Sequence, residues 1–176
     1  MDFTMMNYSI KANIKVAVLS ATLLLAGCSA IFPKPALYVP PHNTPDVAKI
    51  RLMGAPMSYA LYQKDSAGKE TGGWVQEHSA YVNILLGNTQ DLGFPKLKHK
   101  DYSDTFFETT LLPDRETTIH HSLYDGCTVD LTITPKKNAL YEIHYSYGDK
   151  TGYCVIYAKE IKYDPDMGIY YEDNVK

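Results

Sequence analysis

The fold is decided by residues 127–161, which read CTVDLTITPKKNALYEIHYSYGDKTGYCVIYAKEI. Apolar and polar side chains alternate along three runs, at residues 127–134, 139–147 and 153–161. A period of two is typical of half-buried strands. Proline, asparagine and glycine between the runs indicate turns. The last third of the chain therefore predicts three consecutive β-strands.

The two cysteines of this stretch test how the strands are arranged. In a flat meander with tight turns, Cys127 and Cys154 would both face Ser146 from opposite sides, about 9.6 Å apart at ~4.8 Å per strand. A disulfide tolerates Cα separations only up to ~6.8 Å. The apolar sides match better when Tyr145 faces Cys154 and the first run lies in a second sheet. We therefore predict an inter-sheet Cys127–Cys154 disulfide; the alternative is two independent buried thiols.

The same alternation continues upstream, at residues 47–53, 57–63, 80–86, 106–112 and 116–123. In the first of these, Lys49, Arg51 and Met53 occupy the side expected to face solvent. A turn is expected at residues 113–115, an exposed loop at 64–73 and a long loop at 89–103. No stretch of twelve residues keeps a helical stripe. The sequence predicts an all-β fold for residues 46–176, a two-sheet antiparallel sandwich of about seven to eight strands.

The amino-terminal segment has the build of a secretory signal. Lys11 and Lys15 precede an apolar run of ten residues, 16–25. This length suits a signal peptide but is shorter than the ~20 residues that span a bilayer. Small residues and a cysteine follow in the sequence Leu25-Ala26-Gly27-Cys28.

This tetrapeptide resembles the lipobox of bacterial lipoproteins. The resemblance implies cleavage after residue 27 and acylation of Cys28, which would hold the chain on a lipid bilayer without a transmembrane helix. Ser29 stands where lipoproteins retained at the inner membrane usually carry aspartate, so the resemblance implies the outer membrane. We expect residues 1–27 to be a signal peptide.

Residues 28–45 are expected to be a lipidated tether. Five prolines favour an extended, semi-rigid spacer of ~3.1 Å per residue. Apolar side chains in the same segment suggest the alternative that it packs on the domain; these are Ile31, Phe32, Leu37, Tyr38 and Val39.

A second resemblance covers about residues 106–161. The chain is similar there to small uncharacterised proteobacterial lipoproteins, through Leu112-Pro113, Cys127, Thr134-Pro135, Tyr141-Glu142-Ile143 and Cys154-Val155. Those proteins often carry a small residue and glycine after the first proline, whereas this chain has Asp114-Arg115. The resemblance implies no activity.

Charge and motifs exclude several function classes. The formal net charge is −3, and residues 1–27 hold two of the 17 basic and one of the 20 acidic residues, so the expected mature chain carries −4. This balance, without basic runs, argues against nucleic acid as a partner. No serine-hydrolase, zinc-protease or phosphate-loop motif occurs. We therefore expect neither catalysis nor a cofactor.

Two groups of residues resemble metal sites, but their spacing does not suit metal binding. His120 and His121 are adjacent on a predicted strand, so they point to opposite faces and cannot easily join His144 around one ion. Residues 164–168 resemble a calcium loop, but the glycine comes one position early and Val175 stands at the twelfth position. We expect no metal.

Tyrosine is the one compositional excess that suggests function. Fourteen of the 15 tyrosines follow Cys28, and eight of them crowd the final third: Tyr141, Tyr145, Tyr147, Tyr153, Tyr157, Tyr163, Tyr170 and Tyr171. A rigid apolar ring with a polar tip suits protein interfaces. The alternative is that these rings fill the core and its rims. The expected contact surface consists of Tyr145, Tyr147, Tyr153 and Tyr157.

The sequence thus predicts an outer-membrane lipoprotein whose domain faces the periplasm and binds another envelope protein as an accessory module. An alternative is a periplasmic immunity lipoprotein that neutralises a toxin. A third hypothesis is an enzyme acting on cell wall or lipid.

Overall fold

The structure, a computed structural model, describes residues 35–42, 44–77, 87–122, 127–148 and 152–175. The described residues of the unit from Pro35 to Lys176 are all-β apart from one 3-10 turn, η1 (Pro56–Ser58). No described helix is long and apolar enough to cross a membrane. The described strands are β1 (Ala48–Met53), β2 (Tyr59–Lys64), β3 (Glu70–Trp74), β4 (Phe106–Leu111), β5 (Thr117–Ser122), β6 (Thr128–Ile133), β7 (Leu140–Gly148), β8 (Tyr153–Asp164) and β9 (Ile169–Asn174).

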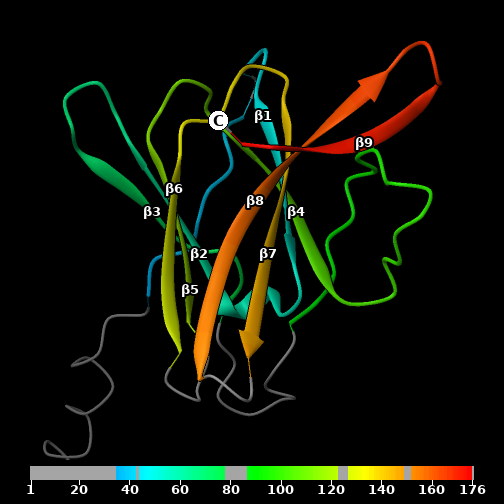
Figure 1. Ribbon diagram of the computed structural model, residues 1–176. Coiled ribbons are helices and arrows are strands. Elements are labelled where there is room, and N and C mark those ends of the chain that lie inside the picture. The colour runs from blue at the N-terminus through cyan, green and yellow to red at the C-terminus, as the bar shows by residue number, and fades with distance from the viewer. Residues whose placement is uncertain (1–34, 43, 78–86, 123–126, 149–151, 176) are drawn as a thin grey trace, which may run out of the picture. The chain divides into compact units, whose positions relative to one another are not determined.

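The strands form two sheets that face each other (Figure 1). One sheet has the order β4-β1-β7-β8-β9 and the other β3-β2-β5-β6. Every pair is antiparallel except β1 and β7, which are parallel. The predicted two-sheet sandwich is confirmed. The described residues contain nine strands. Two of these, β3 and β9, were not predicted from the sequence. The strand predicted at 80–86 lies outside the described residues.

Alternation along the strands builds the core. Most side chains that point between the sheets are apolar and almost fully buried, which removes their surface from water. They include Ile50 and Leu52 from β1, Leu61 from β2, Ile119 from β5, and Tyr141 and Ile143 from β7.

The cysteine pair links the two sheets. β6 lies in the four-stranded sheet, while β7 and β8 lie in the other. Cys127, just before β6, is joined to Cys154 in β8 with a Cα separation of 6.2 Å. The predicted inter-sheet disulfide therefore fits the structure.

The register of β7 and β8 differs from the prediction by two residues. Tyr147, not Tyr145, faces Cys154, and Tyr145 faces Ile156. The predicted faces are nevertheless right, because a shift of two residues keeps every side chain on its side of the sheet. Burial decides which side chains share a face of the sheet, and the length of the turn decides which residues are paired.

The segment around residues 113–115 joins two sheets. β4 pairs with β1, whereas β5 pairs with β2 and β6. The turn expected at these residues therefore does not close a hairpin but carries the chain from one sheet to the other.

The prediction of an exposed loop at residues 64–73 is wrong in its second half, where β3 forms. The segment just before β1 provides part of its pairing: Trp74 N donates to Ala36 O at 2.9 Å, and Tyr38 N donates to Trp74 O at 2.8 Å. Glycine permits this approach, because a Cβ at Gly73 would lie 2.1 Å from Ala36 O. Part of the expected tether therefore packs against the domain.

Candidate functional site

Three neighbouring strands each place a charged residue in the same row. Arg51 of β1 faces Glu108 of β4 on one side and Glu142 of β7 on the other. All three point away from the sandwich core, on the side where the sequence placed Arg51. The expectation that this side faces solvent is wrong, because Arg51, Glu108 and Glu142 are completely buried. The segment 87–105 covers them.

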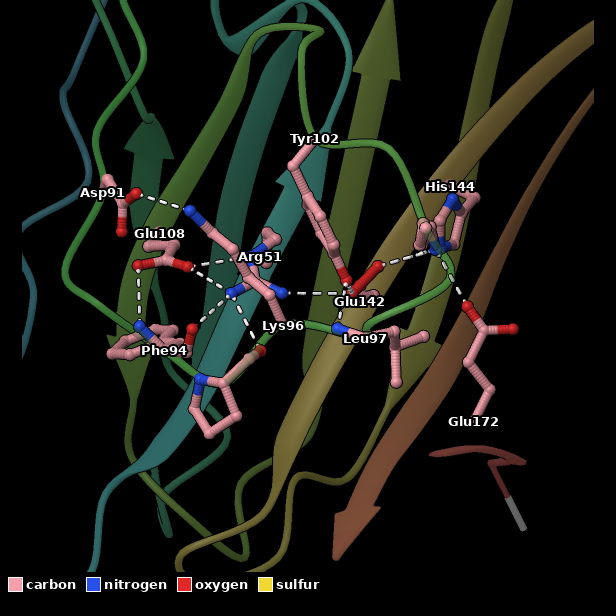
Figure 2. A network of polar contacts seen from close by, with 12 residues as sticks. Arg51, Asp91, Phe94, Lys96, Leu97, Tyr102, Glu108, Glu142, His144 and Glu172 are labelled. Atoms are coloured by element: carbon pink, nitrogen blue, oxygen red, sulfur yellow. Dashed lines mark hydrogen bonds and ion pairs between the residues drawn. The ribbon is translucent and has the colours of Figure 1, made fainter. Parts of the chain in front are cut away.

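The Arg51 guanidinium holds this covering segment to the sheet. Nε and Nη2 donate to Glu108 Oε1 at 2.8 and 2.5 Å, and Nη1 donates to Glu142 Oε1 at 3.0 Å. Nη2 also donates to the carbonyl oxygens of Phe94 and Pro95 (Figure 2). A planar fork of donors suits such a task better than a lysine would.

Glu108 binds the backbone of the same segment. Its Oε2 accepts hydrogen bonds from Leu92 N at 2.5 Å and Phe94 N at 3.3 Å. Gln90 lies beside β4, with Gln90 N donating to Phe106 O and Glu108 N donating to Gln90 O. Both oxygens of the buried carboxylate are therefore partnered, as buried charges require.

Glu142 forms the second half of the network. Its Oε1 also accepts from the Tyr102 hydroxyl at 2.6 Å, and its Oε2 accepts from Lys100 Nζ at 2.8 Å. The Tyr102 oxygen in turn accepts from Leu97 N at 3.2 Å. Buried apolar side chains pack beneath the segment and complete its attachment: Phe94, Leu97, Leu140 and Ile161.

The end of this network has the ligand types of a metal site. Ligand atoms of Glu142, His144 and Glu172 all lie within 4.8 Å of one another. The ammonium of Lys100 lies among them, donating to Glu142 and Glu172 at 2.8 Å and contacting His144 Nε2 at 3.0 Å. The cation that these groups hold in the structure is therefore the side chain of Lys100.

The pKa values of Glu142 and Tyr102 in this network lie far from neutral pH. Burial alone would raise the pKa of Glu142, but its contacts with His144, Lys100 and Tyr102 lower that pKa from 4.5 to about 2. Burial and the hydrogen bond to Glu142 raise the pKa of Tyr102 to about 12. Neither group has the near-neutral pKa that general acid–base catalysis favours. The network's evident role is to fix segment 87–105 on the sheet.

The histidines considered as metal ligands lie apart. His120 contacts Asp130 Oδ1 at 2.6 Å on the outer face of the four-stranded sheet, whereas His121 is buried and stacks on Tyr145. His144 lies on the outer face of the other sheet, next to Lys100. In the segment resembling a calcium loop, Asp164 Oδ1 accepts from the backbone N of residues 166 and 167, which closes the β8–β9 turn.

The four predicted contact tyrosines do not form one surface. Tyr145 points into the core, with its ring 3.9 Å from that of His121. Tyr147 is exposed but lies on the same side of β7. Tyr153 and Tyr157 lie on the outer side of β8, where Tyr157 stacks on His144. Cys28, the predicted lipidation site, lies outside the described residues.

The clearest exposed aromatic surface is formed by other tyrosines of the final third, which lie outside the four selected from the sequence. Beyond Ile161, β8 loses its partner β7 and pairs only with β9, so the two strands project as a two-stranded ribbon (Figure 1). Four large side chains of this element are 36–64 % exposed: Tyr163, Met167, Tyr170 and Tyr171. The rings of Tyr163 and Tyr170 pack at 5.0 Å. We call residues 162–171 the ribbon.

Two hollows lie on the described surface. A groove of about 460 Å³ lies along β6 and β8, lined mainly by apolar and threonine side chains. A smaller one of about 250 Å³ lies where the amino-terminal segment crosses the four-stranded sheet, beside Gln63 and Arg115. Neither hollow is lined by the buried ion network.

The fold and these features define an all-β sandwich with a buried ion network and an exposed aromatic ribbon. Comparison of the chain with protein-family models, curated proteins and solved structures gives no match. The functional argument therefore rests on the residues themselves.

Proposed function

We propose that this chain is an outer-membrane lipoprotein whose periplasmic domain binds another protein of the cell envelope. One observation carries the binding role: the ribbon exposes Tyr163, Tyr170 and Tyr171 on a two-stranded element that pairs with no third strand of the described part of the chain. Such a hairpin is marginally stable by itself in water. Tyrosine is the side chain that interfaces favour. A protein partner would both cover these rings and support the ribbon.

The lipobox at Cys28 supports the anchor. The length of the chain that follows it limits the distance between the domain and the membrane. Only residues 29–34 separate Cys28 from the described domain, which begins at Pro35. At about 3.3–3.6 Å per extended residue, this linker spans roughly 25 Å at most. The domain would therefore work close to the membrane that holds it.

The test is in-cell cross-linking of the tagged chain, followed by mass spectrometry of what is captured. The proposal predicts one dominant protein partner, and a toxin as that partner would favour the immunity alternative. The control is Cys28→Ser, which should abolish incorporation of labelled palmitate. Palmitate that still enters the C28S chain, or no reproducible protein partner, would contradict the corresponding half of the proposal.

A further inference from the structure

We propose that β9 accepts an extended segment of the partner as a sixth strand along its edge opposite β8, and that this segment carries two adjacent basic residues beside two adjacent apolar ones. The inference rests on the proposed binding function and names the chemistry of its partner. It is argued from the sheet edges, from their charge and from the residue order along β9.

The edge strands of the two sheets differ in how far other parts of the chain cover them. Gln90 covers the edge of β4, and Ala36 and Tyr38 cover the edge of β3, in each case through backbone hydrogen bonds. β6 pairs only with β5, but the disulfide ties its start to β8. Within the described residues, β9 pairs only with β8 and has neither protection.

β9 lacks some of the usual features that block an edge, and the charges it does carry, Glu172 and Asp173, are both acidic. Its six residues, Ile169–Asn174, contain no proline, glycine or lysine. Uncovered edges without such features are templates for pairing with another chain. Addition of a strand to an exposed edge is an established mode of peptide recognition, in which main-chain hydrogen bonds give affinity and side chains give specificity.

Charge identifies the kind of strand that fits. Residues 159–174 contain two lysines and five acidic residues, a net charge of −3, which becomes −2 when the Lys100 ammonium that donates to Glu172 is included. A second copy of this chain would bring like charges together along β9, which is unfavourable. A basic segment would be attracted instead, so the occupant is a segment of a different protein and not a second copy.

The order of residues along β9 predicts the order of residues in the partner strand. Tyr170 and Glu172 lie on one face of the strand, and Tyr171 and Asp173 lie on the other. A new strand would place two consecutive residues opposite the tyrosines and two consecutive residues opposite the acids. Apolar residues suit the first pair and basic residues the second. An antiparallel partner would therefore read basic-basic-apolar-apolar.

The probe is a nine-residue acetylated peptide with the central sequence Arg-Lys-Val-Tyr, tested for binding to the disulfide-intact domain. Two further versions carry backbone N-methyl groups on the even or on the odd residues. Because alternate N–H groups of a strand point to opposite edges, one methylated version should lose binding and the other should keep it. On binding, hydrogen exchange should slow at the alternate β9 amides that do not donate to β8.

A charge-swapped variant tests specificity without changing net charge. Lys162 Nζ donates to Asp173 Oδ2 at 2.5 Å. The double variant Lys162→Glu/Asp173→Lys keeps this ion pair in reverse but removes an acid from β9. It should bind the peptide about tenfold more weakly, equivalent to ~1.4 kcal/mol.

The outcomes separate this inference from the proposed function. Absent binding, equal binding of both methylated peptides, or unchanged exchange in β9 would overturn the inference. A cellular partner that protects other residues would overturn it too, while leaving the binding function in place. Slower exchange in β9 together with loss of binding in one methylated version would support it.

Discussion

Arg51 and Glu142 are 91 positions apart in the sequence, yet Arg51 Nη1 lies 3.0 Å from Glu142 Oε1 in the buried outer face of the five-stranded sheet. They meet because β1 and β7 are parallel neighbours with these two residues in register. The contact explains why a long segment without regular structure, residues 87–105, lies firmly on that face. It also supplies the first prediction.

Replacing Arg51 by methionine should be strongly destabilising. The variant leaves Glu108 and Glu142 buried without their shared cation, and breaking such a pair typically costs ~3–5 kcal/mol. Urea unfolding followed by circular dichroism measures the loss. Lys49→Met is the matched control, because Lys49 is on the same strand and face but only partly buried. Equal losses in the two variants would show that the buried network does not stabilise the fold.

The stability of the domain should fall as the pH drops from about 5 towards 2. The pKa of Glu142 is lowered from 4.5 in the unfolded chain to about 2 in the folded one, so the ionised form stabilises the fold. That contribution is complete above the unfolded pKa and disappears as the carboxylate is protonated. Glu142→Gln should therefore be less stable at pH 7 and show a flatter loss between pH 5 and 2. Parallel curves for the two proteins would contradict this assignment.

Gly73→Ala should release the amino-terminal segment from β3. The new Cβ would lie 2.1 Å from Ala36 O, so the backbone pairing on both sides of residue 37 must open. We expect faster proteolysis at residues 35–42 and a shift in the fluorescence of Trp74, the single tryptophan. Thr71→Ala, on the exposed end of the same strand, is the control and should change neither. Unchanged proteolysis in the glycine variant would contradict the packing of residues 36–38.

Reduction of the disulfide should lower the melting temperature. Cys127 and Cys154 close a loop across 27 residues and tie β6 to β8, and a bridge of this kind contributes ~2–4 kcal/mol. The double variant Cys127→Ser/Cys154→Ser should melt where the reduced protein melts and should not respond to reductant. Free thiols in the untreated protein, together with no shift on reduction, would contradict the bridge.

Local patterns in the sequence were enough to predict most of the fold. Period-two alternation identified seven of the described strands, and the cysteine geometry placed β6 in the second sheet. β3 was missed because its glycines are typical of a loop. Its pairing with Ala36 and Tyr38 cannot be read from local sequence. The β7–β8 register was wrong by two residues because the faces fix only its parity.

The candidate site depends on contacts that alternation does not reveal. Arg51, Glu108 and Glu142 each occupy a side that would ordinarily be solvated, and only the covering segment makes them buried. A signal was present, since Arg51, Glu108 and Glu142 each interrupt a largely apolar part of a strand. Recognising it required knowing that β4, β1 and β7 are neighbours. The tyrosines of the ribbon belonged to the expected group, but the strand β9 that presents them was missed because it carries little apolar alternation.

The most direct test of the binding account is photo-cross-linking in cells from two positions of the lipidated chain. A photoreactive residue would replace Tyr171 in the ribbon or Leu92, an exposed apolar residue near the β4 edge. The account predicts that position 171 captures one dominant envelope protein and position 92 does not. Capture of the same protein equally from both positions, or from neither, would contradict it.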